Sequence, residues 1–417
     1  GTDLGLLKTK AVPKGNGTYE ITGQKIFITS GDHDLTENII HLVLARTTDA
    51  PKGTKGISLF LVPKFEVSDD GVVGSRNGVS TNSIESKMGI KGSPTCVLNF
   101  ENSKGIMIGP ENKGLNSMFT MMNLERIVVG VQGLGIAETA YQNAVAYSKE
   151  RKQGKANNSK NGETDLIIKH ADIRRSLMNM KSIIEGQRSF AFWLSQQSDL
   201  TLSHDDKDVR GDASNMVALL TPVIKSFFTD NGVEITNDAI QVFGGYGYTK
   251  DQGIEQLFRD NRITPIYEGT NSVQAIDLVY RKISSEGIFE NFIKSMDNEI
   301  KNYKNEKNLE SFLNIFEKYR EILVSFTKWM REKINSNKDD ASAACNDYLK
   351  VLGYTALAFA WIKTLKISFE KQNSNKEFYE DKINTGKYYF EKILPRAQSH
   401  YVVGTSGSHT TMNAKFN

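Results

Sequence analysis

The sequence predicts an α+β protein of several domains, in which a β-barrel-like domain is followed by an all-helical bundle and a further all-helical extension. Two observations carry this prediction. Short apolar runs separated by glycine and proline fill residues 1–110, whereas apolar residues repeat at helical spacing through residues 111–285 and 286–417. A chain of 417 residues is long enough for two or three domains.

The first region is expected to consist of strands. Apolar side chains alternate along Tyr19–Ile28, on either side of a turn predicted at Thr22-Gly23. Glycine and proline interrupt the pattern, for example at Gly71–Gly78, where we expect no strand. Further strands are expected at the short apolar runs Ile39–Leu44, Ile57–Val62 and Val97–Phe100.

The second region changes to helical spacing after Pro110. A charged break at Arg151–Glu163 separates its first two helices, and Pro222 is a candidate kink in the third. The expected helices are Leu115–Lys149, Ala171–Gln197, Ala213–Phe243 and a last one that follows Glu268 and ends near Lys282.

The third region is helical throughout, and its aromatic residues are expected in the core because large rings rarely stay fully exposed. These aromatic residues are Trp329, Tyr348, Tyr354, Phe359 and Trp361. The expected helices are Phe289–Tyr303, Leu309–Lys333, Ser342–Glu370 and Glu377–Val403.

Composition gives no sign of a nucleic-acid or membrane partner, because the formal net charge is only +3 and no apolar run approaches the ~18 residues of a membrane span. Cys96 and Cys345 lie far apart, which predicts a reducing compartment: the cytoplasm or, in a eukaryote, the mitochondrial matrix. The six histidines show no paired spacing, so no metal site is expected. The opening at Gly1 predicts that the chain begins inside a domain.

Glu268 is the candidate catalytic residue. It follows the apolar pair Ile266 and Tyr267, which can exclude water from the carboxylate and make it a stronger base. Gly269 allows the backbone to approach a ligand, and Thr270 is a helix-capping type whose helix start suits an anion such as phosphate. The alternative is an ordinary exposed glutamate before a capped helix.

A second glycine-rich stretch, Gln241–Tyr248, lies just upstream. It is not the dinucleotide-binding fingerprint, because Lys250 stands at the third glycine position and no strand–turn–helix context surrounds it. We interpret it as a tight loop between helices, whose backbone amides can still contact a cofactor.

A set of motifs spread over most of the first two regions resembles the acyl-CoA dehydrogenase family. They are Gly23-Gln-Lys-Ile-Phe-Ile-Thr29, Lys87-Met-Gly-Ile-Lys-Gly-Ser93, Glu125-Arg126, Glu150-Arg151, Gln241-x-x-Gly-Gly245 and Ile266-Tyr-Glu-Gly-Thr270. The run Leu352–Ala358 and the phrase Glu268–Asp277 resemble the long branch that includes 3-methylmercaptopropionyl-CoA dehydrogenases. The resemblance implies that residues 1–110 are the middle β domain, incomplete at its N-terminus, that 111–285 are the C-terminal helical domain, and that 286–417 are an extension.

The resemblance also implies a reaction, the FAD-dependent α,β-dehydrogenation of an acyl-CoA thioester to the 2-enoyl-CoA. Glu268 matches the family's base, which removes the α-proton while the flavin accepts the β-hydride. Glu125 matches a position where some members carry the base instead. Because those members lack a carboxylate at the Glu268 position, we assign the role to Glu268.

Cofactor and substrate contacts carry over from the same resemblance. Phe27 stands where a tryptophan usually lies beside the flavin ring, and Thr29 matches a hydroxyl that bonds the reactive flavin nitrogen. The expected FAD-binding residues are Phe27, Ile28, Thr29, Arg151, Gln153, Gln241, Gly244, Gly245, Thr270, Asn271 and Ser272. The expected substrate-side residues are Thr2, Asn123, Arg126 and Gly269.

Partners follow from the resemblance as well. We expect an electron-transfer flavoprotein as electron acceptor, and a homodimer or homotetramer, because Arg151 and Gln153 match residues that reach the flavin of a neighbouring subunit. The alternatives are an acyl-CoA oxidase and a non-catalytic DNA-binding flavoprotein of the same fold. The second alternative predicts a basic stripe on the extension, which Glu306 interrupts within Lys301–Lys307.

Overall fold

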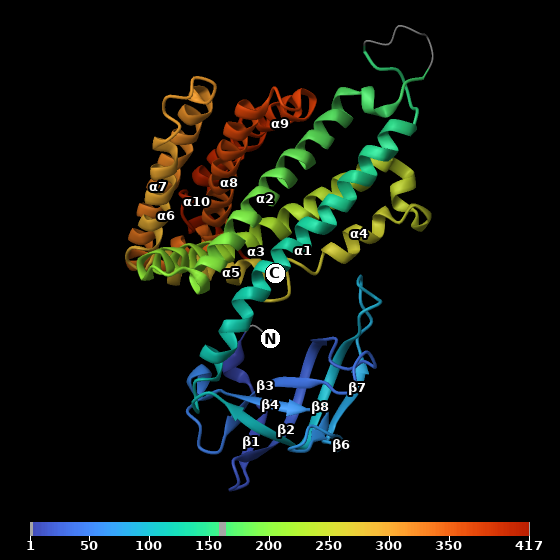
Figure 1. Ribbon diagram of the computed structural model, residues 1–417, viewed down its shortest axis with the longest axis vertical. Coiled ribbons are helices and arrows are strands. Elements are labelled where there is room, and N and C mark those ends of the chain that lie inside the picture. Colours follow the sequence, from blue (N-terminus) through green and yellow to red (C-terminus); the bar gives the residue numbers. More distant parts are fainter. Residues whose placement is uncertain (1–2, 158–163, 417) are drawn as a thin grey trace. The chain divides into compact units, whose positions relative to one another are not determined.

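The computed structural model describes residues 3–157 and 164–416, and it falls into two compact units, Gly1–Glu125 and Arg126–Asn417 (Figure 1). The first unit holds the strands and the second holds the helices, as the change of apolar spacing predicts. Helix α1, Gly114–Glu150, begins in the first unit and continues into the second.

The first unit is a closed β-sheet. The strands follow the ring β2-β1-β3-β4-β8, and a further pairing of β2 with β8 closes it, while β7 adds to the outside edge of β8. Closure removes the free edges that an open sheet exposes, and it confirms the predicted barrel-like fold. The strands are β1 Lys10–Pro13, β2 Thr18–Thr29, β3 Ile40–Thr47, β4 Ser58–Pro63, β5 Phe65–Val67, β6 Val73–Arg76, β7 Val79–Ile84 and β8 Thr95–Ile108.

The barrel is filled by side chains that point inward from alternate positions of its strands. Phe60 and Phe100 are fully buried, and burying one such ring stabilises the fold by about 1.5–3 kcal/mol. The Tyr19 ring packs edge-on against Phe60 with 5.0 Å between centroids. The interior also contains Ala11, Ile21, Val43, Ala45, Val62, Val79, Cys96 and Leu98.

Two expectations about the strands were wrong. No turn forms at Thr22-Gly23, because β2 runs unbroken through it and absorbs the glycine as a register shift between Ile21 and Gly23 against β8. Strand β6 lies inside Gly71–Gly78, which we expected to be a break, and it pairs with β5 as a separate two-stranded sheet.

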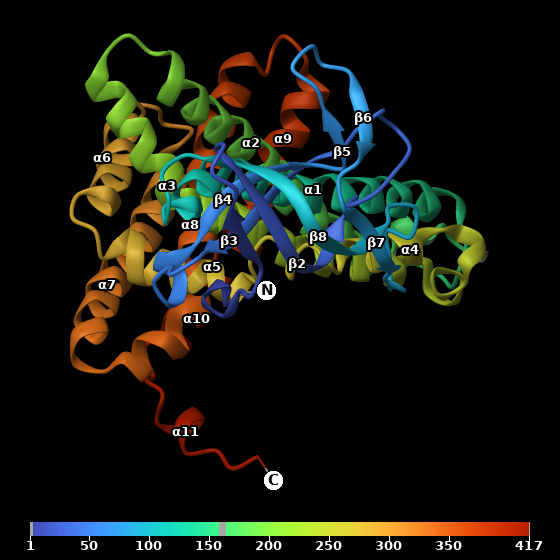
Figure 2. The same cartoon turned by 90° about the horizontal axis from the view of Figure 1, so that it is seen from below.

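The second unit contains nearly all of the helices, and Figure 2 shows them in a second view. Besides α1, the α-helices are α2 Ala171–Ser203, α3 Lys207–Phe243, α4 Ile254–Asn261, α5 Asn271–Asp277, α6 Ile288–Lys301, α7 Glu310–Ser336, α8 Lys338–Lys371, α9 Lys376–Tyr388, α10 Arg396–Gly404 and α11 His409–Met412. Two π-helical turns, η6 Leu278–Ile283 and η7 Tyr389–Ile393, continue α5 and α9. The 3₁₀ turns are η1 Leu4–Leu6, η2 Gly53–Gly56, η3 Ile167–Lys169, η4 Gly244–Tyr248 and η5 Lys250–Gln252.

The helices continue further than expected at some ends and break where we expected none. Helix α3 begins six residues before Ala213, where Asp206 accepts a hydrogen bond from the Asp208 N–H, and it runs through Pro222 without ending. The segment Glu377–Val403, expected as one helix, divides into α9, η7 and α10 near Pro395, whose missing N–H cannot continue the hydrogen-bond ladder.

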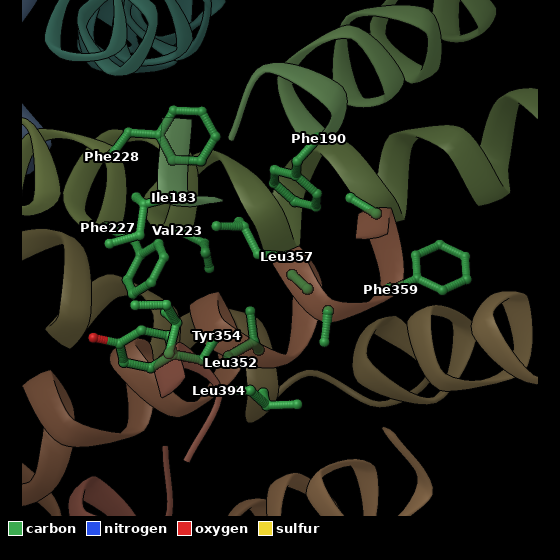
Figure 3. Packing of buried hydrophobic residues seen from close by; sticks show 14 of the residues in the cluster. Ile183, Phe190, Val223, Phe227, Phe228, Leu352, Tyr354, Leu357, Phe359 and Leu394 are labelled. Carbon is green, nitrogen blue, oxygen red and sulfur yellow. The ribbon is translucent and has the colours of Figure 1, made fainter. Parts of the chain in front are cut away.

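A single core runs through the second unit, formed where α2, α3 and α8 pack on one another (Figure 3). Four of the five expected core aromatics, Tyr348, Tyr354, Phe359 and Trp361, are buried there, whereas Trp329 is only half-buried against the core. The Trp361 indole N–H donates to the Ser182 carbonyl at 3.0 Å. Core residues occur on both sides of the expected boundary at residues 285/286, so packing is continuous across it.

Both cysteines are buried free thiols. Burial raises the pKa of Cys345 to about 12, so this thiol stays protonated and unreactive at neutral pH. Within the described residues, no helix is long and apolar enough to cross a membrane.

Helices α1 and α3 approach closely at Gly130, where an added Cβ would lie 2.6 Å from the Ile224 carbonyl oxygen. We expect Gly130→Ala to lower the free energy of unfolding by about 1–3 kcal/mol, because backbone atoms must separate to admit the methyl group. Gly135→Ala is the matched control, since an added Cβ at this exposed position of the same helix meets nothing within 4 Å. There, alanine should raise stability by about 0.5–1 kcal/mol. Urea denaturation measures the free energy of unfolding of both variants. Equal effects of the two changes would contradict the close approach of α1 and α3 at Gly130.

Candidate functional site

Glu268 lies in a strained turn that joins α4 to α5. Its φ is +55°, in the left-handed region that non-glycine residues rarely occupy, and Gly269 follows at +83°. The Asn271 N–H donates to the Pro265 carbonyl at 3.0 Å, which closes the loop that holds Glu268. A strained backbone at a glutamate that the sequence singles out supports a functional role, because such strain concentrates at active sites.

The loop leads directly into α5, as its capping residues predict. Thr270 is the N-cap, and its hydroxyl accepts from the Val273 N–H at 3.4 Å. The Gln274 side chain reaches back and donates to the Glu268 carbonyl at 3.1 Å. Loop and helix start therefore hold each other in place.

The two apolar neighbours of Glu268 behave differently. Tyr267 is half-buried, and its hydroxyl donates to the Gln132 side chain of α1. Ile266 is 46% exposed, so within this chain it does not exclude water from the carboxylate as we expected. Of the two neighbours, Tyr267 is the one that is half-buried and held by a hydrogen bond.

Asn271, an expected cofactor contact, uses its side chain inside the protein. Its Oδ1 accepts from Lys225 Nζ at 2.8 Å, and its Nδ2 donates to Asp230 Oδ1 at 2.7 Å and to Thr229 Oγ1 at 3.0 Å. The three partners belong to α3. Both the side chain and the backbone N–H of Asn271 are thus engaged within the protein, which does not support the expected cofactor contact.

Two cations interact electrostatically with the Glu268 carboxylate. They are Arg126 at the start of the second unit and Lys225 in the middle of α3. An added Cβ at Gly269 would lie 4.0 Å from Arg126 Nη2. Burial lowers the pKa of Arg126, and the negative charges of Asp277 and Glu268 oppose that shift. The guanidinium keeps its charge beside the loop, because an arginine is not deprotonated in proteins.

Lys225 is completely buried. Burial lowers its pKa to about 8, and the charge of Arg126 lowers it further, while Asp230 and Glu268 oppose the shift. Burial in turn raises the pKa of Asp230, opposed first by the hydrogen bond from Asn271. The buried Lys225 and the half-buried Asp230 thus bind opposite ends of the Asn271 side-chain amide.

A second group of expected residues gathers where α1 ends. The Arg151 guanidinium lies over the ring of Tyr246, 5.6 Å from its centroid, so Arg151 is next to the η4 loop that contains Gly244 and Gly245. Added Cβ atoms at these glycines would meet nothing within 4 Å, and Gln241 beside them is exposed. The cluster offers a cation and accessible backbone at one place.

Gln153 lies in the turn after α1. Its backbone N–H donates to the Asp165 carbonyl at 2.9 Å, and its own carbonyl is 2.8 Å from His170 Nε2. Its side chain is exposed, as is that of Ser272 in α5. The side chains of Gln153 and Ser272 are therefore accessible to a ligand.

In the first unit, Phe27 and Thr29 end β2, with Ile28 half-buried between them. Phe27 has φ +57° at an irregularity of the β2–β8 pairing, and its ring is 68% exposed. The bulge turns an apolar ring outward beside the exposed Thr29. An exposed aromatic ring is the kind of surface that a planar ligand covers.

The remaining expected residues are in or near α1. Asn123 and the alternative base Glu125 are exposed on this helix. Thr2 lies outside the described residues.

Sequence reasoning missed Lys225, Asp230 and Gln274. One signal was present: Lys225 interrupts the apolar run 219–228 of α3, where a charged side chain must be buried and therefore needs a partner. Its partner was not readable, because it comes from a helix 46 residues further along the chain.

Family models match almost the whole chain. The acyl-CoA dehydrogenase middle domain matches residues 1–103, the acyl-CoA dehydrogenase C-terminal domain matches 112–283, and a model described as acetyl-CoA dehydrogenase C-terminal like matches 292–415. A butyryl-CoA dehydrogenase of Syntrophomonas wolfei is 34% identical over 95% of this chain and 67% of its own length. The chain belongs to the acyl-CoA dehydrogenase family.

Within this family, the chain is similar to the 3-methylmercaptopropionyl-CoA dehydrogenase of Ruegeria pomeroyi, at 44% identity over 69% of the chain. That match covers 49% of the relative, so the chain spans about half the length of this curated relative. The solved structure of Caenorhabditis elegans ACDH-11 in complex with C11-CoA is similar in fold, with a TM-score of 0.76, 24% identity, and coverage of 100% of this chain and 67% of that one.

The left-handed φ of Glu268 predicts how its replacements rank. Glu268→Gly and Glu268→Ala both remove the carboxylate, but only glycine adopts this φ without strain. We expect the glycine variant to be about 1 kcal/mol more stable than the alanine variant in urea denaturation. At the exposed helical residue Glu321 of α7, the order should reverse. An alanine variant as stable as the glycine variant at position 268 would contradict the strain.

The lowered pKa of Lys225 predicts a pH dependence of stability. Between about 8, its pKa in the folded protein, and its ordinary value of 10.5, the unfolded chain binds more protons, so the Lys225 contribution to stability rises with pH across this window. Below about pH 8 both states are protonated and the contribution is constant. We expect wild type to gain stability relative to Lys225→Met between pH 8 and 10.5. The exposed Lys328→Met should show no such trend in urea denaturation at the same pH values.

Proposed function

We propose that the protein removes two hydrogens from the α,β bond of an acyl-CoA thioester, with Glu268 as the base. The observation that carries this proposal is the Glu268 loop: a carboxylate on a strained backbone, fixed to α5 and accompanied by two cations. The same residue matches the position of the family's base. Membership of the acyl-CoA dehydrogenase family supports the reaction class.

The chemistry assigned to this chain is proton removal. The Glu268 carboxylate takes the α-proton, and the electron pair of that C–H bond becomes the second bond of the 2-enoyl-CoA as hydride leaves the β-carbon. FAD, when bound, supplies the acceptor for that hydride. An α-proton of a thioester is a weak acid, so negative charge developing on the thioester oxygen needs a donor, and the family resemblance assigns this to the Glu268 backbone N–H.

The residues present fit an FAD. Arg151 over Tyr246 beside the open Gly244-Gly245 backbone suits a diphosphate, because guanidinium and amide N–H groups both bind phosphate oxygens. Phe27 and Thr29 offer an exposed apolar ring and a hydroxyl for a flavin ring. A fold relative from Bacillus anthracis, 19% identical with a TM-score of 0.75, was solved in complex with FAD.

Further contacts are proposed from the family pattern. Ile28, Gln153, Gln241, Thr270, Asn271 and Ser272 complete the proposed FAD contacts. From the sequence match alone, Thr2, Asn123, Arg126 and Gly269 are proposed as substrate contacts. Of these, Arg126 has the most direct support, since its cation lies beside Gly269.

Electrons leaving the protein are proposed to pass to an electron-transfer flavoprotein. A solved structure of the electron transferring flavoprotein of Acidaminococcus fermentans is similar to 67% of this chain, with a TM-score of 0.51 and 32% identity. We also propose a homodimer or homotetramer, in which Arg151 and Gln153 serve the flavin of a neighbouring subunit.

Anaerobic flavin bleaching by a panel of acyl-CoA thioesters tests the assignment in the full-length protein. We expect Glu268→Gln to slow bleaching by at least about a thousandfold, because the amide cannot accept the α-proton. Glu125→Gln is the matched control and should keep most of the rate. Equal loss from the two changes would refute a single base at Glu268, and flavin that no thioester bleaches would refute the dehydrogenase.

A further inference from the structure

We propose that Lys225 is a positioning residue, whose buried ammonium acts through Asn271 to hold the start of α5 and, with it, the Glu268 loop. The inference rests on the proposed function of Glu268 and adds a residue that does not touch the substrate.

The first support is the environment of Lys225. It lies at the centre of α3 between Ile224 and Ser226, both of them buried, and none of its own surface is exposed. An apolar side chain of similar length would fill this space without the cost of taking an ammonium out of water. We infer that the ammonium charge has a role at this position, and it donates a hydrogen bond to Asn271 Oδ1 at 2.8 Å.

The second support is the geometry of Asn271. A carboxamide accepts at one end and donates at the other, so a cation facing one end and a carboxylate facing the other fix which way it points. Lys225 faces the oxygen, and Asp230 faces the nitrogen at 2.7 Å. Fixed in this way, Asn271 ties the first turn of α5 to α3.

The third support is the connection from Asn271 to Glu268. The Asn271 N–H closes the loop onto the Pro265 carbonyl, at 3.0 Å. Glu268 is in the middle of that loop, on a backbone conformation that must be imposed from outside. The Glu268 loop is thus connected to α3 in two steps. Lys225 binds the Asn271 side chain, and the Asn271 N–H binds the Pro265 carbonyl at the start of the loop.

Lys225 also contributes its charge. The Glu268 carboxylate interacts electrostatically with both Lys225 and Arg126. The other charged groups that act on this pair of cations or on Asp230 are Asp277 and Arg281 after the loop, Arg262 before it, and Lys350 of α8. Removing Lys225 therefore leaves Arg126 as the nearby cation in α1 and makes the surroundings of the base more negative.

The test compares Lys225→Met, Asn271→Ala and the double variant with Lys328→Met, an exposed lysine of α7. The first readout is hydrogen exchange of the Val273 and Gln274 amides, which needs no substrate. We expect exchange to rise about tenfold or more in each of the first two variants, the scale for losing a hydrogen bond to a charged group. Because both changes break the same link, the double variant should add little. Lys328→Met should change nothing.

The second readout is the pH profile of thioester-dependent flavin bleaching in the full-length protein. In Lys225→Met, the acid limb should move to higher pH, because a carboxylate that loses a neighbouring cation keeps its proton to higher pH. A purely structural defect would lower the rate at every pH without moving the limb.

Three results would overturn the proposal. The first is unchanged hydrogen exchange of the Val273 and Gln274 amides, and the second is a double variant whose loss of protection equals the sum of the two single losses. The third is a bleaching rate of Lys225→Met that falls equally at every pH. If Lys225→Met does not fold, Asn271→Ala decides by the same exchange readout. If no thioester bleaches the wild-type flavin, the proposed function fails, while the exchange comparison still decides the positioning role.

Discussion

The Asn271 side chain is the contact on which the candidate site depends. It joins α5 to α3 through a buried lysine on one side and a carboxylate on the other. The loop before it contains Glu268 at a φ of +55°, a conformation that a free chain would abandon. Rigid support from outside the loop is therefore a condition for presenting the carboxylate in this way.

That support extends into the third region of the chain. Helix α8 packs directly on α3, where an added Cβ at Gly353 would lie 2.6 Å from the Phe227 ring. Figure 3 shows Phe227, Tyr354 and Leu357 within one core. Because Phe227 is two residues from Lys225 on the same helix, packing by the C-terminal helices stabilises the element that holds the site.

The charged groups at the site also support one another, because the two cations interact with the same carboxylate, Glu268. Lys225 is fully buried and Arg126 is half-buried, and both interact with carboxylates that include Glu268. Unpaired, each cation would be costly to bury. The charge of Glu268, the proposed base, thus also stabilises one buried and one half-buried cation.

By itself the sequence determined the order of a β region and helical regions, the long helices α1, α7 and α8 to within a few residues, the Thr270 cap, and the family, because periodicity, capping and motifs are local signals. It did not determine the unbroken strand β2, the division of α9 from α10, the exposure of Ile266 or the internal use of Asn271. Only the tertiary structure decided the course of β2 and the use of Asn271, because their partners, β8 and α3, lie far from them along the chain. The break near Pro395, in contrast, is a local signal that sequence reasoning overlooked. Lys225 is the clearest example. Its place in an apolar helical run predicts a buried charge that needs a partner, and only the tertiary structure identifies that partner as Asn271.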